Sequence, residues 1–168
     1  NDILKEMIGL AAKLPISDQV AMGAATRFMM AGFKQADLSN LVTTMSDIQG
    51  LNPGRGAQAM EDFANIMTRI KSAGLNEMDF HRLTMETHID PDKMRKSLVG
   101  MGYVIKDVQA LKRAITAGTI NKDDFLASVL GGVSSMTGGK GVGALSGKMA
   151  QTVTGMMSTL EGRKFALM

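Results

Sequence analysis

The chain of 168 residues contains no cysteine and no tryptophan, and it has only one tyrosine. Without cysteine, a disulfide bond, a thiolate metal site and a cysteine nucleophile are all excluded. Neither sign of charge dominates, because 19 basic and 16 acidic residues are interspersed along the chain. Specific nucleic-acid binding usually needs basic residues that are concentrated on one face. We therefore expect no specific nucleic-acid partner.

Long apolar runs are also missing, since none reaches the roughly 18 residues that a membrane-spanning helix needs. We expect no membrane span in this segment. The apolar fraction of 45% is ordinary for a folded domain, so one domain with a conventional core is feasible. The first residue is Asn1 and not methionine, and we expect the chain to be a piece of a longer protein.

Methionine, by contrast, is abundant, with 16 residues. Its unbranched, flexible side chain fills irregular spaces in a core, and it also adapts to apolar partners at a surface. Two interpretations therefore stay open. The methionines either fill the interior or form a face that binds apolar partners.

Two helix junctions repeat one pattern, in which a helix ends at Ala-Gly and the next helix begins with Asn. In the first junction, Asn76 is expected at the N-cap with Asp79 placed like the acid of a capping box. Leu75 and Phe80 have the spacing of a hydrophobic staple. The second junction repeats these roles with Asn121, Asp124, Ile120 and Phe125.

Apolar residues at three- and four-residue steps, together with start and stop signals, predict eight short helices. They are expected at 3–14, 18–31, 38–50 and 57–73, around Phe80 and Leu83, at 91–101, at 104–115 and from the second junction to Leu130. No segment shows strand-like alternation. We expect an all-α, compact bundle of about seven to eight short helices with a glycine-rich flexible C-terminal segment. The predicted parts are a helical domain at 1–130, a glycine-rich linker at 131–147 and a C-terminal helix or extension at 148–168.

The two histidines are the first candidates for a site. His81 and His88 are seven residues apart, about two helical turns, so a shared metal ion would require a bend between them. The Asp90-Pro91 pair predicts a new helix directly after His88. Surface or polar-interface positions are the more consistent interpretation.

Three carboxylate pairs are spaced closely enough to suggest acid and base catalysis: Glu61 with Asp62, Glu77 with Asp79, and Asp123 with Asp124. Most of these residues fall in expected first helical turns, where a carboxylate is stabilised by the helix dipole.

The glycine tract 138–144 follows no predicted strand, and Gly147-Lys148 lacks the upstream glycine of a phosphate loop. The densest basic positions are interrupted by acids, which is typical of a solvated helix face; they are Lys93, Arg95, Lys96, Lys106, Lys112 and Arg113. We expect no catalytic, cofactor-binding or metal-binding residues, and we expect that the protein is not an enzyme.

The order of the helix junctions along the chain resembles that of a known protein family. The relevant residues are Leu14-Pro15, Ala31-Gly32-Phe33, the long helix at 57–73, the junction at 74–83, His88-Ile89-Asp90-Pro91, and Gly118 to Phe125. Taken together they resemble a domain toward the N-terminal part of phage and prophage tail tape measure proteins. The segment 146–160, with Thr154-Gly155, is similar to an exit segment that follows in that family.

This resemblance implies a helical, non-catalytic structural protein of the virion that contributes to tail length determination and tail tube assembly. The implied partners are tail tube proteins and tail assembly chaperones, together with self-association. The implied location is the lumen of the virion tail, after a period in the host cytoplasm during assembly. On this view exposed methionines supply weak apolar contacts, with Met45, Met60 and Met67 as the positions to test.

Two alternatives remain from the residues themselves. One is a helical adaptor that binds amphipathic partner helices in a Met-rich groove. The other is an enzyme such as a cell-wall hydrolase, which would need two converging carboxylates in a cleft. The flanking coding sequence separates the tape measure from the adaptor, because only the former continues for many hundreds of residues.

Overall fold

The computed structural model describes residues 2–137, and this part of the chain is all-α, as the sequence predicts. It contains eight helices and no strand. The helices are α1 (Asp2–Ala11), α2 (Asp18–Ala31), α3 (Gln35–Gly50), α4 (Gly56–Ala73), α5 (Glu77–Thr87), α6 (Pro91–Gly100), α7 (Val108–Ala117) and α8 (Lys122–Thr137). The predicted C-terminal extension and most of the predicted linker lie outside the described residues.

Local side-chain hydrogen bonds explain where most of these helices begin. Asn76 Oδ1 accepts the backbone N–H of Asp79 at 2.8 Å, and Asn121 Oδ1 accepts the N–H groups of Asp123 and Asp124. Both predicted N-caps are therefore confirmed. The Asp79 carboxylate does not complete the capping box, because its Oδ1 accepts from Arg69 at 2.6 Å instead.

The predicted start of the seventh helix is wrong. That helix, α7, begins at Val108 and not at Val104, because the Asp107 side chain accepts the N–H of Ala110 and acts as the N-cap. Val104 is fully exposed in the preceding loop, while its neighbour Ile105 is buried. Val104 fits the apolar spacing of α7, so periodicity alone does not show this boundary.

The boundary drawn at residue 130 is also misplaced, because α8 continues without interruption to Thr137. Glycine normally weakens a helix, but Gly132 lies where α8 crosses α6. A Cβ at Gly132 would stand 3.0 Å from Met94 Cγ and 3.3 Å from Met94 N. This glycine therefore permits a close helix approach, and it does not start a linker.

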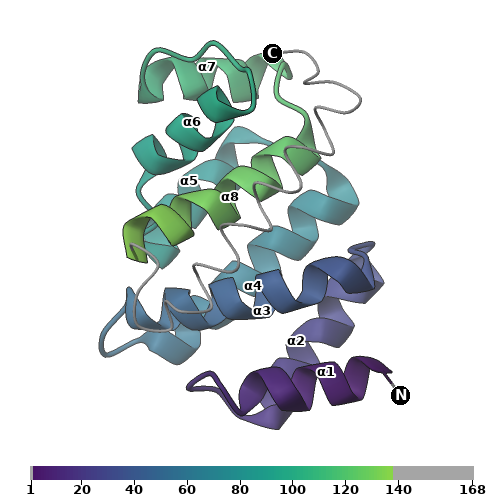
Figure 1. The fold of residues 1–168 in the computed structure, drawn as a ribbon. Coiled ribbons are helices and arrows are strands. Elements are labelled where there is room, and N and C mark those ends of the chain that lie inside the picture. Colours follow the sequence, from purple (N-terminus) through teal and green to yellow (C-terminus); the bar gives the residue numbers. More distant parts are fainter. Residues whose placement is uncertain (1, 138–168) are drawn as a thin grey trace.

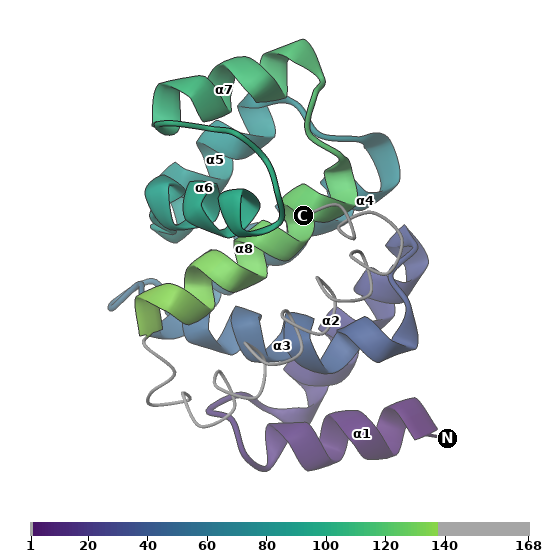
Figure 2. The ribbon, with the colours of Figure 1, turned by 45° about the horizontal axis from the view of Figure 1, so that its top comes forward.

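Helices α4 and α8 form the centre of the molecule. Helix α4 packs against α2, α3, α5 and α8, while α8 packs against α3, α4 and most extensively α6. Helices α1 and α7 lie at opposite ends, as both views show (Figures 1 and 2). One continuous apolar core runs between these ends, from Met7 to Val133.

The two repeated junctions meet inside this core. The Phe80 and Phe125 rings are 6.1 Å apart between centroids and are arranged edge to face, a favourable geometry for an aromatic pair. Two further hydrogen bonds link the junctions to neighbouring helices: Lys122 Nζ donates to the last-turn carbonyl of Lys71, and Thr116 donates to Glu77. The start of α8 is thereby joined to the end of α4, and the start of α5 to the end of α7.

Candidate functional site

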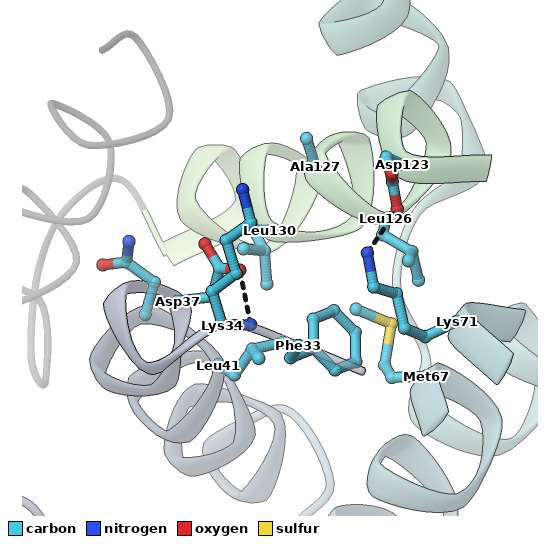
Figure 3. Close-up of a pocket in the computed structure, with 11 residues that line it drawn as sticks. Phe33, Lys34, Asp37, Leu41, Met67, Lys71, Asp123, Leu126, Ala127 and Leu130 are labelled. Atoms are coloured by element: carbon cyan, nitrogen blue, oxygen red, sulfur yellow. Dashed lines mark hydrogen bonds and ion pairs between the residues drawn. The ribbon is translucent and has the colours of Figure 1, made fainter. Parts of the chain in front are cut away.

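A pocket of about 190 Å³ lies between α3, α4 and α8 (Figure 3). Its walls are mostly apolar and come from residues far apart in the chain. Apolar lining residues are Phe33, Leu41, Met67, Leu126, Ala127 and Leu130. Such a surface suits an apolar side chain of a partner better than it suits a charged ligand.

The charged residues around this pocket are engaged in structural contacts. Lys71 Nζ lies 2.8 Å from Asp123 Oδ1 and 5.4 Å from the centroid of the Phe33 ring (Figure 3). The Asp37 carboxylate accepts the backbone N–H of Lys34 at the start of α3. Asp37 and Asp123 are thus held by different groups, and the geometry does not show the acid and base pair of a hydrolase.

The Glu61 and Asp62 carboxylates, paired in the sequence, turn to different partners. Glu61 accepts from Arg27 on α2 at 3.1 Å, whereas Asp62 accepts from Arg55 at 3.0 Å and from Gln58. These contacts tie α4 to α2 and to the loop before α4. The two side chains therefore act as separate structural anchors.

In the other two carboxylate pairs, the two members also bond to different partners. Asp124 Oδ2 accepts the hydroxyl proton of Tyr103 at 2.6 Å, while Asp123 pairs with Lys71. Burial, and secondly this hydrogen bond, raise the pKa of Tyr103 to about 12. Glu77 and Asp79 bond to Thr116 and Arg69 as described above.

The histidines do not converge. His81 is exposed on α5, whereas His88 ends this helix in the left-handed conformation with φ of 62°. His88 Nδ1 lies 2.6 Å from Asn52 Oδ1, a carbonyl oxygen that can only accept, so Nδ1 carries the proton. Within residues 2–137 no three His, Asp or Glu side chains are grouped to hold a metal ion.

Asn52 is a residue that the sequence analysis missed. It directly precedes Pro53 and Gly54 between α3 and α4, yet it is 1% exposed, and its amide donates to the carbonyls of Ile48 and Thr87 at 2.9 Å each. Arg55 adds a bond to the carbonyl of Glu86. These contacts join the loop before α4 to the end of α5. Only the clustering of Asn and Arg among turn residues hinted at such a role.

The predicted basic positions fall into two groups. Arg95 is held by Asp92 at 2.7 Å and by the carbonyl of Ile105, and its hydrogen bond is the main cause of the lowered pKa of Asp92. Lys112 and Arg113 on α7 form no ion pair within the described part of the chain. The glycine tract 138–144 lies outside that part.

The methionines divide between core and surface. Six of those within residues 2–137 are buried, namely Met7, Met45, Met60, Met67, Met94 and Met101. The three positions chosen to test exposed contacts, Met45, Met60 and Met67, are therefore interior residues, and that choice is wrong. In the described part of the chain, the exposed methionines are Met29 and Met30 on α2 and Met78 and Met85 on α5.

Comparisons of the chain with protein-family models, with curated proteins and with solved structures found no match. No helix among the eight described here is long and apolar enough to cross a membrane.

Proposed function

We propose that this chain is a structural, non-catalytic segment of a phage or prophage tail tape measure protein. The observation that carries the proposal is the ordered series of junction residues quoted from the sequence. Gly32, Gly74, Pro91 and Gly118 each lie at a helix end. The resemblance thus depends on residues with a definite structural role, in an order that covers most of 14–130.

The contacts of the ionisable side chains are consistent with a structural role. The six carboxylates considered for catalysis each bond to a partner that joins two helices or fixes a helix start. Such contacts keep neighbouring helices in a fixed arrangement. In the proposed role, the segment would contribute to tail length determination and to assembly of the tail tube.

The proposed partners are tail tube proteins and tail assembly chaperones, with self-association as a further contact. Exposed Met78 and Met85, and not the buried methionines, would supply the weak apolar contacts. The proposed location is the tail lumen, after a period in the host cytoplasm during assembly.

An in-frame deletion of codons 2–137 from the parent gene tests this function. We expect electron micrographs to show shorter tails, or no tails, because a ruler without this segment is shorter or cannot start assembly. The parent reading frame should also continue for many hundreds of residues with further helical segments. Tails of unchanged length from the deletion strain would contradict the proposal.

The adaptor is the second candidate, and the exposure of Met78 beside Phe80 on α5 favours it. It predicts a native chain close to this length and one discrete partner groove. A stop codon soon after Met168 would support the adaptor, whereas a long downstream reading frame would favour the tape measure.

A further inference from the structure

Two adjoining hollows of about 350 and 260 Å³ lie between α5 and α7, and both are lined by Glu77 and Lys112. Figures 1 and 2 place these two helices at the end of the molecule away from α1. We call this region the α5–α7 surface. It comprises Met78, Phe80, His81, Gln109, Lys112 and Arg113.

The apolar part of the α5–α7 surface faces outward. Met78 is 61% exposed, although it lies next to the buried ring of Phe80. Met85 is seven residues further along α5, hence on the same side of the helix, and it is 63% exposed. Met78 therefore borders a hollow that residues 2–137 leave open, and Met85 extends the exposed apolar face along the same side of α5.

The charge of the α5–α7 surface is basic overall, because the cations Lys112 and Arg113 outnumber the one carboxylate, Glu77. Lys112 is half-buried at its centre and Arg113 is exposed beside it, and neither forms an ion pair within residues 2–137. The neighbouring acid, Glu77, accepts a hydrogen bond from Thr116. An incoming carboxylate would consequently meet two cations without a described ion-pair partner.

We propose that the α5–α7 surface binds an amphipathic helix of a partner protein that carries acidic residues along one edge of its apolar face. The apolar residues of the partner cover Met78 and Met85, and its carboxylates pair with Lys112 and Arg113. Charge complementarity gives such contacts their specificity, whereas the apolar contact contributes most of the affinity. This inference deepens the proposed function and rests on it in taking the segment to be an interaction protein.

Two synthetic peptides of about 15 residues, a length at which isolated helices become marginally stable, provide the probe. Both carry the same leucine face, one flanked by Glu and the other by Lys. We expect the acidic peptide to shift the methyl NMR signals of Met78 and Met85 and to leave those of Met29 and Met30 unchanged. We expect it to bind about tenfold more tightly than the basic peptide at low salt, and this preference should shrink as salt is added.

Charge reversal at the surface supplies the matched comparison. The double variant Lys112→Glu, Arg113→Glu should reverse the preference between the two peptides. The control variant Lys5→Glu, Lys13→Glu makes the same change in net charge at exposed positions near α1 and should keep the preference. Met78→Gln should weaken binding of the acidic peptide, whereas Met30→Gln should not.

Equal affinity for the two peptides, no binding of the acidic one, or an equal effect of both charge reversals would overturn the inference. Concentration-dependent self-association that shifts the Met78 and Met85 signals without peptide would also overturn it, since a second copy would then be the occupant. These outcomes are separable from the deletion experiment. Shortened tails together with failed peptide binding would reject this surface alone and leave the proposed function standing.

Discussion

Tyr103 is the only tyrosine of a chain without tryptophan, so its ionisation can be followed without interference. Its hydroxyl donates to Asp124 and accepts the backbone N–H of Asn121 at 3.2 Å. It therefore supports the start of α8 directly. Burial first, and the Asp124 hydrogen bond second, raise its pKa from 10.0 to about 12.

This shift predicts a loss of stability in alkali. The unfolded chain releases the tyrosine proton near pH 10 while the folded chain retains it up to about pH 12. The stabilisation by neutral Tyr103 is thus fully present below pH 10 and is lost as the pH rises toward 12. Ultraviolet absorbance of tyrosinate should give the raised pKa directly.

Urea unfolding at several alkaline pH values checks the consequence. Lysines also titrate in this range, so the variant Tyr103→Phe serves as the comparison. It should be less stable than the parent at neutral pH, and its stability should fall less steeply above pH 10. A parallel decline in the two proteins would show that the loss comes from other groups.

Asn52 predicts a second effect at the scale of one residue. The change Asn52→Ala removes both amide bonds to the carbonyls of Ile48 and Thr87 and also the acceptor of His88. Because Asn52 and its two bonds to these carbonyls are buried, we expect the free energy of unfolding to fall by about 1–3 kcal/mol. Exposed Asn65 is the control, and Asn65→Ala should change it by no more than about 0.5 kcal/mol. Equal effects would contradict the role assigned to Asn52.

At the scale of the helix, the ends were predictable because the signals are local. Asn76, Asn121 and Gly118 act on groups within four residues of themselves, so their effect needs no knowledge of the fold. The start of α7 was missed because Val104 continues the apolar rhythm of the helix. The Asp107 side chain sets that boundary by accepting the N–H of Ala110, and Val104 lies exposed in the loop before it.

Two glycines should respond in opposite ways to alanine. Gly118 has φ of +72° and Gly23 is an exposed residue inside α2, and a Cβ at either would meet nothing within 4 Å. Only backbone preference therefore differs. We expect Gly118→Ala to lower the free energy of unfolding by about 1–2 kcal/mol and Gly23→Ala to raise it by about 0.5–1 kcal/mol. Thermal unfolding followed by circular dichroism measures both, and effects of the same sign would refute the argument.

At the scale of the whole molecule, α8 packs more extensively against α6 than any other two described helices pack against each other, so we expect this contact to contribute to stability. Gly132, like Gly23, lies inside a helix. A Cβ at Gly132, however, would come too close to the buried side chain and the backbone nitrogen of Met94. We expect Gly132→Ala to lower the free energy of unfolding by about 1–3 kcal/mol, as overpacking does. If this variant gained stability as Gly23→Ala should, then α6 and α8 would be less tightly joined than described.

The sequence alone determined the all-α class, most helix ends and the two repeated junctions, because caps, staples and apolar periodicity act over a few neighbouring residues. Only the tertiary structure decided that Phe80 meets Phe125, that Asn52 is buried and that α8 runs through its glycines. It also decided which methionines are interior and left Met78 exposed beside Lys112. Each of these outcomes depends on residues far apart in the chain, whose contact is set by how whole helices pack.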